Sequence, residues 1–241
     1  MATFLLIHGA WHGGWCWDRL VPHLAAAGHR VLAPDLPGHG VDRTPRWRVT
    51  LGDYAQAVHE AARSAGGPVI GVGHSMGGLV LTQAAHDVPE LFAARVYLCA
   101  FVPESGDSLA SLGRADPASA VPGAARLRGL HPEIAPDRVR EVFYGDCTED
   151  DVAWARERLC PNPIRPLLQG ASLDRPVVGP AAYIECTEDE AVSLDHQRCM
   201  RDRLRDPHVV TMITAHSPFL SAPKELARHL DEYARRLTLA S

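Results

Sequence analysis

Lysine is almost missing from this sequence, in which Lys224 is the only lysine among 24 basic residues. The basic residues are outnumbered by 29 acidic ones, the net charge is −5, and no run of basic residues occurs. Proteins that bind nucleic acid or an anionic membrane surface usually carry clustered positive charge. We therefore expect neither nucleic acid nor a membrane as a partner.

Closely spaced cysteines are also missing. The chain has 6 cysteines, and no two of them form a C-x-x-C pair. Zinc sites and the disulfide frameworks of small secreted proteins both require recognisable cysteine spacings. The sequence therefore predicts free thiols and no metal site.

Long apolar runs are absent as well. The N-terminal segment has no basic leader, and its large apolar residues end after Phe4 to Ile7. A secretory signal needs an apolar region of about 7–15 residues, and a membrane-spanning helix needs about 20. We expect a cytoplasmic protein. The 241 residues, of which 46% are hydrophobic, suit one globular domain.

A G-x-S-x-G pattern is present at Gly73-His74-Ser75-Met76-Gly77. The run from Val69 to Val72 before it suits a buried strand, and the small apolar stretch from Gly78 to Ala85 suits a buried helix. A sharp turn between them would expose the Ser75 hydroxyl, which makes Ser75 a candidate nucleophile. Because the bare pattern arises by chance in roughly one chain in fifteen of this length, a glycine-rich turn without chemistry is the alternative.

Strand-like and helix-like segments alternate over residues 1–103. The predicted strands are 3–8, 30–33, 69–72 and 95–101, and the predicted helices are 17–27, 51–65 and 78–85. The alternation returns after residue 177, with strands at 180–186 and 208–214 and helices at 193–205 and 223–237. Such alternation predicts an α/β fold in which a mainly parallel sheet has helices on both faces.

The composition changes between residues 104 and 176. Apolar strand runs vanish there, while proline, arginine and glycine become frequent. We expect an inserted, mostly helical cap, with short helices at 136–143 and 148–159. Residues 1–103 and 177–241 would then form the core.

A serine nucleophile needs a base, and the base needs a carboxylate that holds its tautomer. Sites in open α/β sheets form at the carboxyl ends of the strands. Of the 13 histidines, His216 alone follows the last predicted strand and lies in a loop. Three acids in the loop after strand 180–186 are candidates for the carboxylate, and composition does not separate them: Glu188, Asp189 and Glu190.

An oxyanion hole requires two backbone N–H groups that point to one place. One is expected from Met76, the residue after the nucleophile, where the helix N-terminus also favours negative charge. The other is expected from the glycine-rich loop after the first strand, with Ala10 as the candidate. A plain tight turn is the alternative for that loop.

The sequence resembles the α/β-hydrolase superfamily, and within it the branch of plant methyl esterases, hydroxynitrile lyases of this fold and bacterial carboxylesterases. The matching motifs are Phe4 to Trp15, Asp35-Leu36-Pro37-Gly38-His39-Gly40, Gly73 to Gly78, Cys186-Thr187-Glu188-Asp189 with Gln197, and His216-Ser217-Pro218. They extend over nearly the whole chain and are weakest at 104–176. The resemblance implies the α/β-hydrolase fold, Asp189 as the acid because of its spacing to Gln197, and Ala10 and Met76 as oxyanion donors.

Two positions differ from the lyases of this branch. Those lyases carry a hydroxyl or amide side chain after the first-strand histidine and a lysine after the triad histidine, where this chain has Gly9 and Ser217. Ser217 supplies no charge for a departing cyanide, which favours ester hydrolysis. A hydroxynitrile lyase with the same triad and a non-catalytic small-molecule receptor of the same fold are the alternatives.

The expected function is that of a serine carboxylesterase, which cleaves small to medium, largely apolar esters through an acyl-enzyme. This chemistry needs no metal or organic cofactor, and the partner is the ester substrate; the sequence leaves a homodimer open. The residues expected to bind the substrate, each of which would also suit ordinary core packing, are Gly9, Trp11, Phe101, Phe143, Trp154, Leu168 and Phe219.

Overall fold

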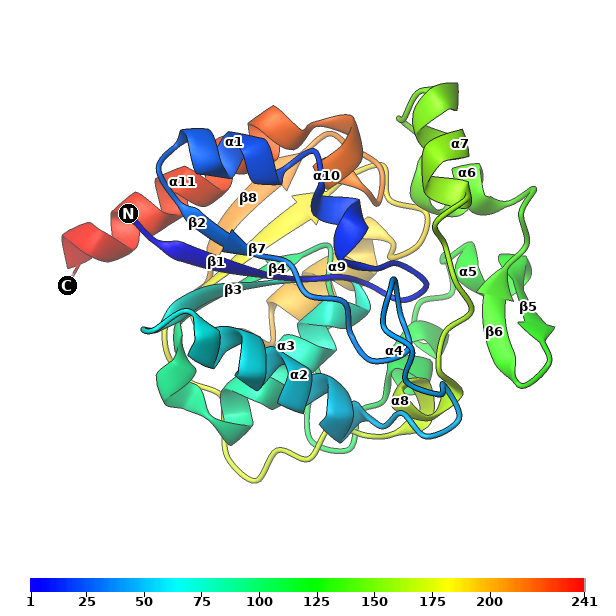
Figure 1. Ribbon diagram of the computed structural model, residues 1–241, viewed down its shortest axis with the longest axis horizontal. Helices are drawn as coiled ribbons and strands as arrows, with labels where there is room; N and C mark the ends of the chain where they lie inside the picture. Colours follow the sequence, from blue (N-terminus) through cyan, green and yellow to red (C-terminus); the bar gives the residue numbers. More distant parts are fainter. Residues whose placement is uncertain (241) are drawn as a thin grey trace.

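A six-stranded parallel β-sheet forms the centre of the protein in a computed structural model that describes residues 1–240 (Figure 1). The strands lie in the order β2-β1-β3-β4-β7-β8, and every neighbouring pair is parallel. Their bounds are Thr3–Ile7 (β1), Arg30–Leu32 (β2), Val69–His74 (β3), Phe92–Leu98 (β4), Ala181–Cys186 (β7) and His208–Met212 (β8). The predicted parallel sheet is confirmed.

Helices cover both faces of this sheet (Figure 1). On one face α1 (Val21–Ala26) contacts α11 (Pro223–Ala240), and on the other α2 (Leu51–Ser64) packs against α3 (Met76–Asp87). The remaining core helices are α9 (Leu194–Arg201), which contacts β7, and the short η1 (Gly14–Trp17), η2 (Pro89–Leu91) and α10 (Pro218–Ser221). No helix within residues 1–240 is both long enough and apolar enough to cross a bilayer.

The sequence explains how α2 and α3 are positioned. A capping box begins α2: the Thr50 hydroxyl accepts a hydrogen bond from the Asp53 N–H, and the Asp53 carboxylate accepts one from the Thr50 N–H. The α2 residues buried against the core recur every three or four positions, as Leu51, Tyr54, Ala55, Val58 and Ala62. Every residue of α3 from Met76 to His86 is buried, so α3 runs through the interior.

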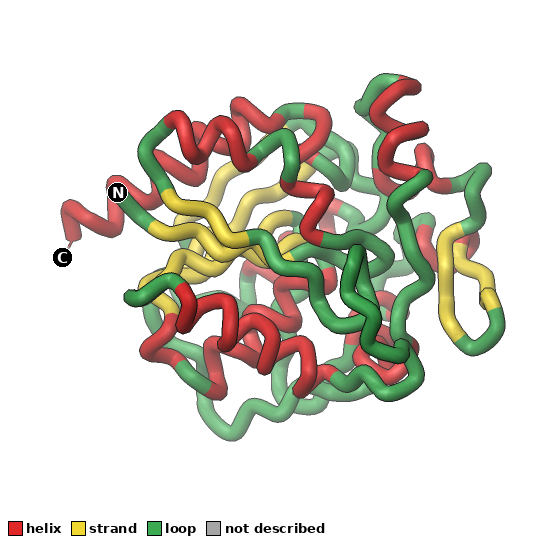
Figure 2. The backbone as a smooth tube through the Cα atoms, in the orientation of Figure 1, coloured by secondary structure: helices red, strands yellow, loops and turns green. Residues whose placement is uncertain are grey.

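The chain leaves the sheet between β4 and β7, where the cap is predicted at residues 104–176. Most of this segment lies beyond the carboxyl ends of the strands, its last residues run back along α3 to the start of β7, and Figure 2 shows that loops make up much of it. Its elements are α4 (Leu109–Arg114), α5 (Val121–Ala124), β5 (Ala125–Arg128), β6 (His131–Ile134), α6 (Val139–Phe143), α7 (Glu149–Arg156) and α8 (Ile164–Leu168). The domain boundaries themselves stay a prediction.

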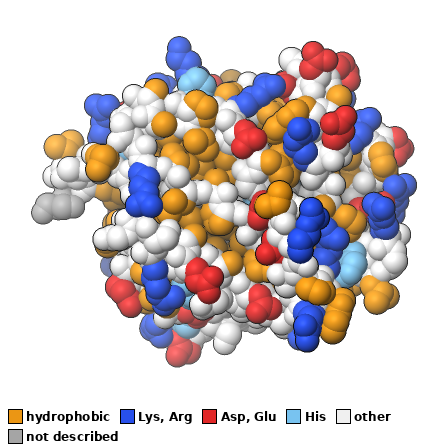
Figure 3. Space-filling model, viewed as in Figure 1, with side chains coloured by type: hydrophobic (Ala, Val, Ile, Leu, Met, Phe, Trp, Pro, Cys, Tyr) orange, Lys and Arg blue, Asp and Glu red, His pale blue; other side chains and the backbone are white. Residues whose placement is uncertain are grey.

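The β5–β6 hairpin was not expected in a mostly helical cap. The sequence of β5, Ala-Arg-Leu-Arg, alternates apolar and polar residues, but it is only four residues long and all four are exposed, so no buried face identifies it as a strand. An ion pair between Arg126 and Glu133 joins its two strands at 2.9 Å, and Gly129 at φ 64° allows its turn. Charged side chains of both signs are mixed over the cap surface (Figure 3).

Two other expectations can be compared with the structure. The helix predicted at 17–27 is shorter in the structure: α1 begins at Val21, because Pro22 lies in its first turn and favours a helix start there, and Trp17 is the last residue of η1. All six cysteines are free, as expected.

Candidate active site

The turn at residues 73–77, which we call the serine turn, joins the end of β3 to the start of α3. Ser75 has φ 53° and ψ −120°, a conformation that non-glycine residues rarely adopt and that costs about 1–3 kcal/mol. The surrounding backbone holds it: the Ser75 N–H donates to Leu98 O at 3.2 Å, and Ser75 O accepts from the N–H groups of Gly78 and Phe101, each at 3.1 Å. A strained residue that its neighbours hold this firmly is typical of functional sites.

Two glycines make the sharp turn sterically feasible. A Cβ on Gly73 would lie 2.5 Å from Gly77 O, and a Cβ on Gly77 would lie 2.4 Å from Ile7 O. Only a hydrogen atom fits at either position. The serine turn therefore needs glycine on both sides of Ser75 and packs directly against the end of β1.

The loops after β7 and β8 bring a histidine and a carboxylate together. His216 Nδ1 lies 2.7 Å from Asp189 Oδ2, and both side chains are buried. The His216 ring packs between His74, with ring centroids 4.5 Å apart, and Phe143, at 5.7 Å. The His74 ring also donates from Nε2 to the backbone oxygen of His216 at 2.9 Å, so the residue before Ser75 supports the backbone of His216.

The geometry distinguishes Asp189 from the two neighbouring glutamates. Glu188 and Glu190 are exposed, whereas Asp189 is buried and its two oxygens accept four hydrogen bonds. Oδ1 accepts from the N–H groups of Ala191 and Val192 at 2.7 and 2.8 Å. Oδ2 accepts from His216 and from Gln197 Nε2 at 3.3 Å. These four donors fix the orientation of the Asp189 carboxylate toward His216.

Ser75 and His216 are close but not hydrogen-bonded. Among residues 1–240 no hydrogen bond joins Ser75 Oγ to the His216 ring, although His216 contacts His74, the residue before Ser75. In unliganded enzymes the bond between nucleophile and base is often long and shortens when the substrate binds. The arrangement can thus support proton transfer from Ser75.

The loop at residues 8–14, which we call the N-terminal turn, follows β1. Histidine Nδ1 atoms lie 2.8 Å from three of its backbone oxygens: His8 from Gly9 O, His12 from Ala10 O and His39 from His12 O. Because a carbonyl oxygen only accepts, each Nδ1 must carry the proton. Burial lowers the pKa of His8 to about 4 and that of His12 to about 3, so both rings are neutral near pH 7.

Two backbone N–H groups near Ser75 are free to bind a ligand. No acceptor for the Ala10 N–H exists within residues 1–240. Met76 is the first residue of α3, where a backbone N–H has no acceptor inside the helix. Both residues are buried, and the positive end of the helix dipole at Met76 favours an anion.

A cavity of about 330 Å³ opens at Ser75. Ala10 and Trp11 from the N-terminal turn line it on the core side, together with Phe101. The cap contributes most of the rest, mainly apolar side chains such as Leu109, Val121, Pro122, Phe143 and Leu167. Arg114 is the only charged residue among the described lining residues. An apolar ligand of moderate size would therefore fit beside Ser75.

Of the predicted substrate-binding residues, the structure places Trp11, Phe101 and Phe143 in this cavity. Leu168 is 60% exposed, and its neighbour Leu167 lines the cavity instead. Phe219 is buried against Trp17 and His74.

The other two predicted residues also lie outside the cavity lining. Trp154 packs against Trp15 and carries the Arg158 guanidinium over its ring. Gly9 has no side chain to offer, and a Cβ there would come within 2.9 Å of His74 Nδ1. Its role is close packing of the N-terminal turn against the serine turn.

Comparison with known proteins identifies the family. A model of the "Alpha/beta hydrolase family" matches residues 4–229. The chain belongs to this family.

Known relatives of this hydrolase include two enzymes that are similar over nearly their full length. It is 31% identical to the pyrethroid hydrolase of Sphingobium wenxiniae, over 97% of this chain and 88% of that protein. It is also 31% identical to methylesterase 2 of Arabidopsis thaliana, over 94% of each chain. The crystal structure of a pyrethroid hydrolase from Sphingobium faniae superposes with a TM-score of 0.86, at 27% identity and 97% coverage of both chains. The predicted resemblance and the α/β-hydrolase fold are confirmed.

One group of side chains in residues 1–240 of this hydrolase has the spacing of metal ligands. Ligand atoms of His74, Cys99 and His216 lie within 4.8 Å of one another. These atoms already have partners, because His74 Nε2 and Cys99 Sγ both contact the backbone oxygen of His216, at 2.9 and 3.5 Å. The group supports the backbone of His216, and the expected absence of a metal stays a prediction.

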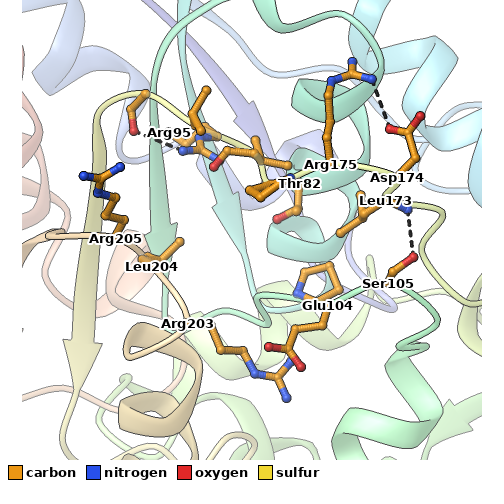
Figure 4. Close-up of a pocket in the computed structure, with 15 residues that line it drawn as sticks. Thr82, Arg95, Glu104, Ser105, Leu173, Asp174, Arg175, Arg203, Leu204 and Arg205 are labelled. Carbon is orange, nitrogen blue, oxygen red and sulfur yellow. Dashed lines mark hydrogen bonds and ion pairs between the residues drawn. The ribbon is translucent and has the colours of Figure 1, made fainter.

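A larger hollow of about 770 Å³ lies on the α3 side of the sheet, under the segment 173–179 (Figure 4). Four arginines line it, and several of their guanidinium groups bind other groups of the protein. Arg95 donates to the backbone oxygens of Val177 and Gly179, and Arg175 pairs with Asp174. The predicted nucleophile, base and acid all lie outside the lining of this hollow. The contacts of Arg95 and Arg175 anchor the segment that leads into β7.

Proposed function

We propose that this hydrolase is a serine carboxylesterase in which Ser75 is the nucleophile, His216 the general base and Asp189 the carboxylate that orients the base. The observation that carries the proposal is the buried hydrogen bond of 2.7 Å between His216 and Asp189, next to a serine in a strained turn. Its relatives include a pyrethroid hydrolase and a methylesterase, which supports ester cleavage.

In the proposed reaction Ser75 Oγ attacks the ester carbonyl while His216 Nε2 takes its proton. Asp189 holds the proton of His216 on Nδ1 and stabilises the imidazolium. His216 then returns the proton to the departing alcohol. A water molecule, activated by His216 in the same way, attacks the acyl-enzyme and releases the carboxylic acid. No metal or organic cofactor takes part.

The tetrahedral intermediate carries a negative oxygen that needs two donors. We assign these to the N–H groups of Ala10 and Met76, which support the role because neither has an acceptor of its own. Removing one such donor from a serine hydrolase typically costs about 3–4 kcal/mol of transition-state stabilisation.

The substrate class follows from the cavity. Its apolar lining and its volume of about 330 Å³ suit a neutral, small to medium ester with a largely apolar body. The proposal includes Trp11, Phe101 and Phe143 as side chains that contact this body. It names no nucleic acid or membrane partner, places the protein in the cytoplasm and leaves a homodimer open.

The deciding experiment replaces the nucleophile. We expect Ser75→Ala to lower kcat/KM for p-nitrophenyl butyrate by about 10⁴-fold or more, the usual result when a triad serine is removed. The matched control is Ser64→Ala, which removes a hydroxyl bonded to Ala61 O at the exposed end of α2. Activity of Ser75→Ala close to that of the wild type would refute the proposal.

Two further measurements separate the alternatives. Cyanide release from mandelonitrile without ester turnover would identify a hydroxynitrile lyase. Failure of a fluorophosphonate probe to label wild-type Ser75, together with absence of ester turnover, would identify a receptor. The esterase is expected to label and to turn over esters.

A further inference from the structure

Trp11, in the N-terminal turn, has a strained backbone. Its φ is 64°, a left-handed value that is a genuine outlier for a bulky residue. Such a conformation is strained and persists only where the surroundings of the residue force it. It directly follows Ala10, whose N–H is assigned to the oxyanion hole.

The contacts that hold Trp11 in this conformation come from the cap. Its N–H donates to Asn162 Oδ1 at 3.1 Å, and its backbone oxygen accepts from the Cys160 N–H at 2.9 Å. Its indole Nε1–H donates to Pro132 O at 3.0 Å. All three hydrogen bonds connect the N-terminal turn to residues more than 100 positions away in the chain.

Asn162 is itself held rigidly. It is fully buried, its side-chain Nδ2–H donates to Pro163 O at 2.9 Å, and its N–H donates to Pro132 O at 2.9 Å. Pro132 O thus accepts from both Trp11 and Asn162. This closed set of bonds leaves the Asn162 amide oxygen in one orientation, toward the Trp11 N–H.

A second cap residue holds the other end of the same peptide group. Ala10 O accepts from His12 Nδ1 at 2.8 Å, and His12 Nε2 lies 2.7 Å from the Tyr144 hydroxyl. Because the His12 ring is neutral, only one of its two nitrogens carries a proton. The Tyr144 O–H, by donating to Nε2, keeps that proton on Nδ1, where Ala10 O needs it.

We propose that Asn162 and Tyr144 are positioning residues through which the cap sets the direction of the Ala10 N–H. Asn162 binds the N–H of the Ala10–Trp11 peptide, and Tyr144, through His12, binds its carbonyl. The Ala10 N–H belongs to the preceding Gly9–Ala10 peptide, whose carbonyl accepts from His8 Nδ1 at 2.8 Å. The two peptides are joined at the Ala10 Cα, so fixing both of them fixes the backbone angles of Ala10 and with them the direction of its N–H. If the contact to Asn162 or the one through Tyr144 is lost, the Ala10–Trp11 peptide can rotate, and the Ala10 N–H is then held from the His8 side alone.

The inference rests on the proposed function, and the experiments distinguish failure of the positioning role from failure of the esterase function. We expect Asn162→Ala to lower kcat for p-nitrophenyl butyrate by about 10–100-fold, part of the effect of losing an oxyanion donor, with KM changed less than about threefold. Affinity for butylboronic acid, which forms an anionic tetrahedral adduct on the serine, should fall by a similar factor. A variant that merely weakens the fold would alter neither quantity in the protein that remains folded.

The matched control is Gln169→Ala. Like Asn162, Gln169 is a cap amide that accepts from a backbone N–H of the core, that of Leu51 at 2.8 Å, but it lies outside the cavity lining and the N-terminal turn. We expect its kcat to stay within about twofold of the wild type, whatever its effect on Tm.

Two more variants keep the test decisive. Asn162→Asp retains an oxygen for the Trp11 N–H, and its second oxygen can donate to Pro163 O in place of the amide only while the buried carboxyl is protonated. Its kcat should therefore lie above that of Asn162→Ala, and the difference should be largest at the acid end of the working pH range. Tyr144→Phe removes one hydroxyl without changing the ring, and should lower kcat about 3–10-fold with KM and the acid limb of the pH profile unchanged, because neutral His12 does not titrate there. If Asn162→Ala fails to fold, Tyr144→Phe decides.

The outcomes are distinct. Wild-type kcat in Asn162→Ala and Tyr144→Phe, together with an inactive Ser75→Ala, would overturn the positioning role and leave the esterase intact. Equal losses of kcat in Asn162→Ala and Gln169→Ala would also overturn it, because they would show a general effect of cap stability. Full activity in Ser75→Ala would instead overturn the proposed function.

Discussion

The serine turn and the N-terminal turn pack against each other at the carboxyl end of the sheet, but different parts of the chain hold them in shape. The serine turn is held mainly by its own glycines and by backbone bonds to the adjoining β4 segment. The N-terminal turn is held by histidine side chains and by cap residues distant in sequence.

The site therefore combines a turn that is held by its local backbone with a turn that is held by side chains. A turn that is built from local backbone can be recognised in a short stretch of sequence, because each glycine has a steric reason. A turn that is held by distant side chains depends on residues that no short stretch of sequence contains. We therefore expect the serine turn to respond to steric changes and the N-terminal turn to respond to protonation and to changes in the cap.

The largest expected effect comes from acid and sharpens this comparison. His8 and His12 are neutral in the folded protein, because burial lowers their pKa values to about 4 and 3 from the ordinary histidine value of 6.5, which applies in the unfolded chain. The unfolded state therefore binds more protons below pH 6.5. The stabilisation is fully present above that pH and is lost as the pH falls, by about 1.4 kcal/mol per pH unit for each ring.

Between pH 6.5 and 4.5 the two histidines together should lower the free energy of unfolding by about 5 kcal/mol. Urea unfolding at several pH values measures this loss. Replacement of exposed His23 by Asn is the control, since its side chain is exposed before and after unfolding, and it should leave the pH dependence unchanged. A free energy of unfolding that stays flat over this pH range would contradict the prediction.

A methyl group in the serine turn is expected to have the next largest effect. Gly73→Ala places a Cβ 2.5 Å from Gly77 O, which should cost about 3 kcal/mol or more and lower kcat by at least tenfold. Gly67→Ala is the control, because a Cβ at Gly67 meets nothing within 4 Å. Thermal unfolding and p-nitrophenyl butyrate kinetics measure both, and equal behaviour of the two variants would show that the turn has room to adjust.

The smallest expected effect lies at the far end of the N-terminal turn. Asp35 Oδ1 accepts from the Gly14 N–H at 2.6 Å, and Oδ2 accepts from the Val41 N–H at 2.8 Å. Asp35→Asn replaces one acceptor with a donor and should lower the free energy of unfolding by about 1–2 kcal/mol. Its kcat should change less than about threefold, because Gly14 is remote from Ala10 in the turn. A loss of kcat as large as that expected for Asn162→Ala would mean that the whole turn moves as one unit.

The pattern of residues predicted much of the fold because it depends on periodicity. The alternation of strands and helices was enough to predict the parallel sheet. The apolar run of β3 and the glycines on both sides of Ser75 predicted a strand followed by a sharp turn. The hairpin β5–β6 was missed because its strands are short and exposed, so no buried face marked them.

The pattern was less informative for the cavity. Leu167 and Leu168 are neighbours of the same type, and only the rotation of α8 decides that Leu167 faces the cavity while Leu168 is exposed. Phe219 follows the loop of His216, yet it packs behind the site against Trp17. Asn162 and Tyr144 carry no motif, and no signal in the sequence alone pointed to them.

The sequence by itself determined the local features of this protein: the strand, the sharp glycine turn at Ser75, and the family to which the chain belongs. The strand and the turn depend on adjacent residues, so their physical cause lies within a few positions, whereas the family is indicated by short motifs spread along nearly the whole chain. The residues of the acidic loop left Glu188, Asp189 and Glu190 open, and the family resemblance implied Asp189, which the tertiary structure places against His216. The tertiary structure alone decided that the cap holds Trp11 through Asn162. Those contacts join segments far apart in the chain, and only folding brings them to hydrogen-bonding distance.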